Sequence, residues 1–183
     1  MEEQLIKDRF FLIVTAIFLI FNTSVVSAQS DAQGFFNQAN FYSQNGDYKN
    51  AIQFYTTALA VQPDFPEAVF RRGIMYAMID DFDRTVEDLT AALRMRSDYR
   101  NTILRTGITF GNNKNYRIAR ALFTAILTVE PHDADTLIWR AMCSFSEGDF
   151  SQALVDIEAA LRINPNDAGA VEVLDLIHQQ LGN

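Results

Sequence analysis

The residues that could support catalysis or metal binding are few and lie far apart. The chain has two histidines, His132 and His178, and a single cysteine, Cys143. A zinc site needs several such side chains at short spacings, and no two histidines stand four residues apart. Phosphate-binding glycine loops and Gly-x-Ser-x-Gly elbows are also missing. We therefore predict no metal, no cofactor and no catalytic residues, and interpret Cys143 as a small buried side chain.

Carboxylates are the other side chains that could support acid–base chemistry, and they are plentiful. Glu87, Asp88, Asp156 and Glu158 stand in stretches of helical periodicity, away from the apolar positions. Charges placed in this way are usually just a solvated face of a helix. We expect these four side chains to face water, and the sequence predicts that the protein is not an enzyme.

The segments that carry these residues are copies of one pattern, repeated at a constant spacing. Residues 148–165 have apolar and small residues at i, i+3, i+4, i+7, i+10 and i+11, which is one stripe of a helix, and residues 46–63 show the same pattern. Four copies run from about residue 32 to 167 without insertion or deletion. The aligned columns are Tyr48, Phe82, Tyr116 and Phe150; Leu59, Leu93, Leu127 and Leu161; and Ala39, Gly73, Gly107 and Ala141.

Each copy contains two predicted helices. The first helices cover about residues 32–44, 69–77, 103–110 and 137–145. The second helices run from after Asp47 to about 62, and over 82–95, 116–129 and 150–163. A ninth helix is expected at about 168–181, with polar residues on one side that suit a terminal cap.

These units resemble the tetratricopeptide repeat. The resemblance lies in a small residue at the eighth position, an aromatic at the eleventh, Gly-Asp-Tyr at the turn, alanine at the twentieth and twenty-seventh, and proline at the thirty-second. It implies an all-α, right-handed superhelix of four repeats, 32–65, 66–99, 100–133 and 134–167, with a capping helix at 168–183. Arg120 occupies a column that is otherwise apolar, so we expect the third repeat to pack less tightly than its neighbours.

The resemblance also implies a concave groove lined by the first helices. The core columns are already filled by residues such as Phe35 and Val69, so a second apolar stripe on these helices is surplus to packing and is interpreted as a binding surface. The residues predicted to contact a partner there are Phe36, Asn40, Phe70, Arg71, Ile74, Arg105, Ile108, Trp139 and Met142.

Two arginines of this set, Arg71 and Arg105, occupy the same position in consecutive copies. Glu67 lies four residues before Arg71 and is expected to pair with it, whereas Asn101 takes that place before Arg105. Arg105 is therefore the better candidate for binding a carboxylate or a backbone carbonyl. Relatives that clamp the C-terminal carboxylate of heat-shock chaperones use five polar residues, of which only Asn40 and Arg105 match here, so that clamp is not predicted.

The N-terminal segment, residues 1–28, has the composition of a signal peptide. Lys7 and Arg9 precede a twelve-residue apolar run at 10–21, and small residues at Val26 and Ala28 favour cleavage after Ala28. The prediction is export to the periplasm or the extracellular space. The alternative is that this segment is retained as a membrane anchor, although it is short for a span of roughly 20 residues.

The charge of the chain limits its partners. The net charge is −8, and removal of residues 1–28 leaves −7. Nucleic acids bind to basic surfaces, so a nucleic-acid partner is excluded, and a membrane contact is expected only if the N-terminal segment is retained. A single cysteine also excludes an internal disulfide.

These observations predict a non-enzymatic scaffold that binds a protein or peptide in the concave groove. The alternative is a structural subunit of an envelope or secretion assembly, which would form an oligomer through the apolar stripe. Light scattering separates the two functions.

Overall fold

The computed structural model describes residue 15 and residues 29–182, and in this part of the chain all regular secondary structure is helical. The predicted signal segment lies outside the described residues, apart from Thr15. A first helix covers residues 29–44. The helices that follow are α2 (Tyr48–Val61), α3 (Pro66–Met78), α4 (Phe82–Met95), α5 (Tyr99–Asn112), α6 (Tyr116–Val129), α7 (Ala134–Ser146), α8 (Phe150–Ile163) and α9 (Ala168–Leu181).

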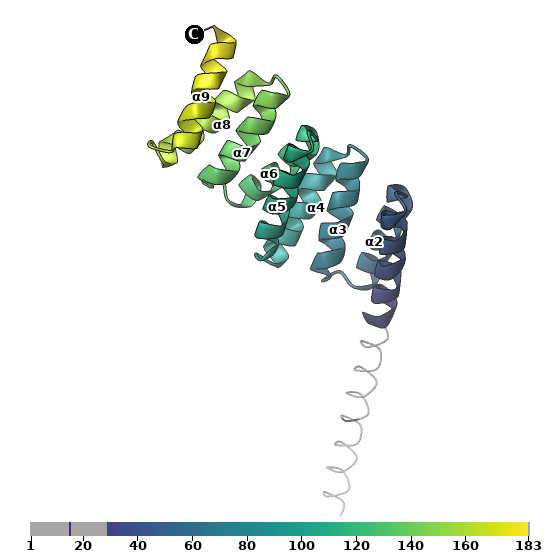
Figure 1. Ribbon diagram of the computed structural model, residues 1–183. Helices are drawn as coiled ribbons and strands as arrows, with labels where there is room; N and C mark the ends of the chain where they lie inside the picture. Colours follow the sequence, from purple (N-terminus) through teal and green to yellow (C-terminus); the bar gives the residue numbers. More distant parts are fainter. Residues whose placement is uncertain (1–14, 16–28, 183) are drawn as a thin grey trace, which may run out of the picture.

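Consecutive helices form hairpins that stack into an elongated, two-layered array. α3 packs against α4, α5 against α6 and α7 against α8, while α9 closes the end against α8. Figure 1 shows α3, α5, α7 and α9 in one layer and α2, α4, α6 and α8 in the other. We call the outward surface of the 29–44 helix, α3, α5 and α7 the first-helix face. A stack of this kind buries each hairpin against its neighbours.

The turns inside the hairpins follow from their sequence. Gly46 and Gly148 adopt positive φ angles of 74° and 82°, and Asp80 and Lys114 take the same left-handed conformation at φ 60° and 64°. In three of these turns the next residue, Asp47, Asp81 or Asp149, caps the following helix: the Asp81 carboxylate, for example, accepts a hydrogen bond from the backbone N–H of Arg84 at 3.2 Å. A side-chain oxygen at this position satisfies one of the free N–H groups of the first turn.

Glycine at the small-residue column lets the two helices of a hairpin approach closely. A β-carbon at Gly107 would lie 2.6 Å from the Phe123 ring, and one at Gly73 would lie 3.1 Å from Leu89. Both neighbours are fully buried on the second helix of the hairpin. The helix contact in the α5–α6 hairpin is thus built around an aromatic ring that packs on bare backbone.

The α5–α6 hairpin is unevenly embedded. α6 buries seven residues of its fourteen, whereas α5 buries only Ile103 and Gly107. α4 packs on α3 and on α6 and touches α5 little. The sequence predicts looser packing for this hairpin as a whole; the structure shows it for α5, while α6 lies at the centre of the core. Arg120 is accommodated at the edge of α6, where it pairs with Glu147 at 2.7 Å.

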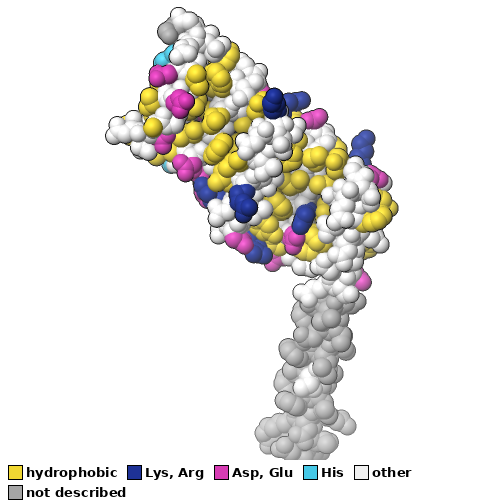
Figure 2. Space-filling view, in the orientation of Figure 1, with side chains coloured by type: hydrophobic (Ala, Val, Ile, Leu, Met, Phe, Trp, Pro, Cys, Tyr) yellow, Lys and Arg dark blue, Asp and Glu magenta, His cyan; other side chains and the backbone are white. Residues whose placement is uncertain are grey.

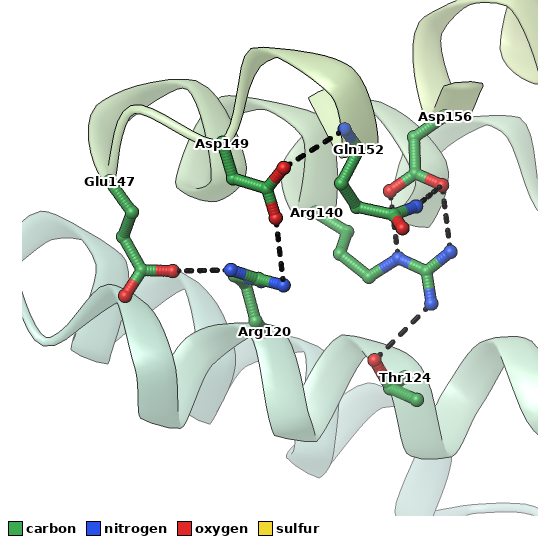
Figure 3. Close-up of polar contacts among 7 residues, drawn as sticks. All are labelled: Arg120, Thr124, Arg140, Glu147, Asp149, Gln152 and Asp156. Carbon is green, nitrogen blue, oxygen red and sulfur yellow. Dashed lines mark hydrogen bonds and ion pairs between the residues drawn. The ribbon is translucent and has the colours of Figure 1, made fainter. Parts of the chain in front are cut away.

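Two carboxylates predicted to face water are instead buried. Asp88 and Asp156 are 6% and 1% exposed, so the prediction is wrong for both. The Arg140 guanidinium donates to both oxygens of Asp156 at 2.7 and 2.8 Å and to the Thr124 hydroxyl at 3.2 Å (Figure 3). The physical reason is that the preceding first helix supplies an arginine fork that matches a carboxylate in two-point geometry.

The same arrangement occurs two hairpins earlier in the chain, between α3 and α4. Arg72 donates to both oxygens of Asp88 at 2.8 Å and to the Thr56 hydroxyl at 3.1 Å. The hairpin between these two pairs, α5–α6, has Thr106 and Leu122 at the equivalent positions. The ion pair therefore alternates with an uncharged contact along the stack.

Candidate binding groove

The nine residues predicted to bind a partner come from the 29–44 helix, α3, α5 and α7. Figure 2 shows the molecule from the side of the first-helix face, where hydrophobic side chains are exposed among lysine and arginine side chains. The structure divides the nine residues into four groups: core residues, half-buried residues with partners in the chain, arginines on the face, and residues that line a pocket.

Phe36 and Phe70 belong to the core, which corrects their assignment to an accessible groove. They are only 6% and 8% exposed. The ring of Phe36 lies 4.9 Å from that of Phe65, and Phe70 stacks on Tyr99 at 5.2 Å. Phe65 and Tyr99 stand where the next first helix begins, so each phenylalanine fills the space between successive hairpins. These rings are required for packing and are not surplus to it.

Asn40 and Ile74 are half-buried and already have partners within the chain. The Tyr55 hydroxyl donates to the side-chain oxygen of Asn40 at 2.6 Å. Burial raises the pKa of Tyr55 to about 12, so the hydroxyl keeps its proton at neutral pH. Ile74 packs against the core clusters on both sides of α3. Both residues support the face and offer only part of their surface to a ligand.

The two arginines of the face differ in their surroundings. Arg71 pairs with Glu67 at 3.3 Å, as the four-residue spacing predicts, and both side chains are about half exposed. Arg105 is exposed on α5, and no carboxylate of the described residues forms an ion pair with it. Of Arg71 and Arg105, it is therefore Arg105 whose charge is available to a ligand.

Ile108, Trp139 and Met142 come together at one pocket between α5 and α7. The pocket has a volume of about 270 Å³. Met142 is 41% exposed at its edge, and Ile108 and Trp139 are half-buried against the Phe123 cluster. The remaining lining residues are Gly111, Asn112, Lys114, Tyr116, Phe123, Cys143 and Ser146.

Most of these remaining lining residues were not predicted from the sequence. Phe123 and Tyr116 reach the pocket from α6, behind the first-helix face, and their columns are read as core. One signal in the sequence is Gly111, because the equivalent position in the next copy is Phe145. A β-carbon at Gly111 would lie 3.6 Å from the Cys143 sulfur, so a larger side chain would occupy the pocket.

Comparison with known families agrees with this geometry. Sequence models described as tetratricopeptide repeat match residues 32–65 and 104–168. This chain belongs to the tetratricopeptide repeat family. No curated protein sequence matches the chain.

Solved structures of other proteins match this chain at 17–20% identity. A mutant of MamA superposes with a TM-score of 0.58 at 20% identity, over 64% of this chain and 86% of that one. MamA from Desulfovibrio magneticus RS-1, from residue 41 onward, gives a TM-score of 0.46 at 17% identity, over 82% and 85%. The first repeat domain of Spaghetti (RPAP3), bound to an HSP90 peptide, gives 0.40 at 19% identity, over 85% and 96%.

The pocket offers this tetratricopeptide protein apolar and aromatic surface with a few polar groups. Burial raises the pKa of the Cys143 thiol to about 11, so it is a neutral, weakly polar wall at physiological pH. Among the described residues, no three side chains of histidine, cysteine, aspartate or glutamate are grouped so that they could hold a metal ion. No helix in the described part of the chain is long and apolar enough to cross a membrane.

Proposed function

We propose that this protein is a non-enzymatic scaffold that binds a segment of a partner protein on the first-helix face. The observation that carries the proposal is the pocket between α5 and α7, where Ile108, Trp139 and Met142 leave apolar surface open. Arg105, one helical turn before Ile108, has no ion-pair partner among the described residues. Apolar surface that is not needed for packing, with a few polar groups around it, is typical of a binding site.

We also propose a more detailed description of the fold. It divides the chain into four repeats, 32–65, 66–99, 100–133 and 134–167, in a right-handed superhelix, with residues 168–183 as the cap. Asp175 supports the role of α9 as a cap. It stands where the first helices have Ala39, Gly73, Gly107 or Ala141, and a carboxylate there discourages close packing of another helix.

The test is partner capture by the purified chain with single substitutions on the face. We expect Arg105→Glu and Ile108→Glu each to abolish capture of a defined partner, while the thermal midpoint barely moves because both side chains are at least partly exposed. Arg94→Glu and Val155→Glu are matched controls: Arg94 is exposed on α4, and Val155 is 57% exposed on α8. Capture that survives both face variants would contradict the proposal.

The proposed setting is the cell envelope or the space outside the cell. The support is the composition of residues 1–28. Lys7 and Arg9 precede an apolar run, and Ala28 is the last residue of the segment. Mass spectrometry of the chain purified from its own cells should find Gln29 as the first residue. Retention of residues 1–28 in the membrane fraction would favour the anchor instead.

A second candidate function is that of a structural subunit, and one exposed aromatic group favours it. Phe41 is 63% exposed at the end of the stack opposite α9, edge-on to Tyr42 at 5.7 Å, and Tyr42 stacks on Phe54 at 5.2 Å. Of the equivalent residues in later hairpins, Met75 and Cys143 are buried and Thr109 is exposed but polar. Light scattering of wild type and Phe41→Ser decides: a stable oligomer that Phe41→Ser dissociates supports this function.

A further inference from the structure

The size and lining of the pocket between α5 and α7 indicate what it accepts. Its volume of about 270 Å³ lies below the range of roughly 300–1,000 Å³ that is usual for whole small-molecule ligands. Its walls are largely aromatic and aliphatic, with Tyr116, Phe123 and Trp139 among them. A space of this kind suits a single bulky apolar side chain.

The charges beside the pocket are positive, although the protein is acidic. Lys114 lines the pocket, and Arg105 stands one helical turn before Ile108 on α5. Neither cation has an ion-pair partner among the described residues, in a chain with 23 acidic and 15 basic residues. Elsewhere arginines usually have one: Arg120, for example, pairs with Glu147 at 2.7 Å and with Asp149 at 3.5 Å.

The acidic residues near the pocket do not neutralise these two cations. Asp80 and Glu147 line a neighbouring pocket together with Lys114, but neither forms an ion pair with it among the described residues, and Glu147 is engaged by Arg120. Asp135 stands at the first turn of α7, one turn before Trp139, and does not line the pocket. Neither Lys114 nor Arg105 is therefore neutralised by an ion pair among the described residues, and opposite charge on a ligand is favoured beside them.

We propose, building on the scaffold function above, that the bound segment is an acidic peptide sequence with a bulky apolar anchor. The anchor side chain enters the pocket between Ile108, Phe123 and Trp139. Carboxylates beside the anchor face Arg105 and Lys114. The apolar contact supplies affinity, and the two cations select the sequence around the anchor.

Trp139 makes the proposal directly measurable, because it is the single tryptophan of the chain and lines the pocket. The probe is the tryptophan-free peptide acetyl-Glu-Glu-Phe-Glu-Glu-amide, titrated into the full chain while tryptophan emission is recorded. We expect a saturable change in emission. Replacing the phenylalanine of the probe with alanine, or its glutamates with lysines, should weaken binding by about tenfold or more. Added salt should weaken it as well.

Variants of the protein locate the contact. Arg105→Glu and Lys114→Glu should each weaken binding of the acidic probe severalfold, and Arg94→Glu should leave it unchanged. Gly111→Leu should fill the pocket and prevent the emission change, with its helix content checked by circular dichroism. Equal binding of the acidic and the lysine probe, or full binding to Gly111→Leu, would overturn the proposal.

The proposal can also fail separately from the scaffold function. If no probe alters Trp139 emission, but the chain still captures a partner in a way that depends on Arg105 and Ile108, then the acidic-anchor specificity is wrong and the scaffold function stands. If capture too is insensitive to Arg105 and Ile108, then both fail.

Discussion

The guanidinium of Arg140 on α7 and the carboxylate of Asp156 on α8 are held together by two hydrogen bonds of 2.7 and 2.8 Å. Asp156 is 1% exposed, and the side chain of Arg140 is 19% exposed. A carboxylate buried to this degree requires a partner, because an unpaired buried charge is strongly destabilising. The pair therefore fixes how the two helices of this hairpin lie against each other.

Removal of one partner should expose this dependence. We expect Asp156→Ala to lower the free energy of unfolding by about 3 kcal/mol, because Arg140 is left partly buried without a counter-charge. The double variant Arg140→Thr with Asp156→Leu copies Thr106 and Leu122 of the α5–α6 hairpin and should recover much of the loss. Urea denaturation measures both.

Glu158→Ala is the matched control for this pair. Its side chain is 55% exposed, and its contact with Arg162 is 4.0 Å long, so we expect a change within about 0.5 kcal/mol. A loss at Asp156 no larger than that at Glu158 would contradict the buried role of the pair.

The turn at Lys114 should be improved by glycine. Lys114 adopts φ 64°, a left-handed conformation that costs a side chain with a β-carbon roughly 1–2 kcal/mol, part of which glycine loses again through its greater freedom in the unfolded chain. We expect Lys114→Gly to raise the free energy of unfolding by about 0.5–1 kcal/mol. Asp80→Gly should gain less, because aspartate tolerates this conformation better than lysine. Thermal unfolding ranks the two variants.

The approach of Phe123 to Gly107 should make this glycine hard to replace. We expect Gly107→Ala to destabilise the protein by about 1–2 kcal/mol, because the new methyl would lie 2.6 Å from the ring, despite the higher helix propensity of alanine. Gly111→Ala on the same helix meets only an ordinary 3.6 Å contact and should be neutral or stabilising. Denaturant unfolding of Gly107→Ala with Phe123→Leu should show partial rescue.

Stability should fall in alkaline solution. Burial raises the pKa of the Cys143 thiol from 9.0 to about 11, so the folded chain holds this proton more tightly than the unfolded chain does. The contribution is complete below about pH 9 and is lost as the pH rises towards about 11. Urea unfolding at about pH 8 and pH 10.5 should show a smaller decrease for Cys143→Ala than for wild type. An equal decrease in the two proteins would mean that the Cys143 thiol does not cause the loss of stability.

Local sequence was sufficient to predict most helix ends, because caps and turns act over a few residues. α4, α6, α8 and α9 cover the ranges that the apolar periodicity indicates. α3, α5 and α7 begin at Pro66, Tyr99 and Ala134, three or four residues before the expected starts at 69, 103 and 137, since their first turns carry little apolar periodicity. At the start of α5 the Asp98 side chain makes no capping hydrogen bond, and the backbone turn from Arg96 to Tyr99 leads directly into the helix.

Features that depend on stacking were harder to predict. Asp88 looks solvated on its own helix, and only the neighbouring helix brings Arg72 to it. The repetition of this pair at Arg140 and Asp156 was visible in the sequence, but its burial was not. In the site, Ile108, Trp139 and Met142 meet at one pocket, whereas Phe36 was misread because its partner, Phe65, lies in a connecting segment.

The small number of buried residues in α5 has a consequence for the motion of this helix. This helix is secured by Ile103 and Gly107 alone among its fully buried positions, while its partner α6 is sunk in the interior. Local opening follows buried area, so the backbone amides of α5 should exchange with deuterium much sooner than those of α6. Local opening of α5 lets the pocket between α5 and α7 widen to admit a ligand and close again, while α6 and the rest of the stack stay in place.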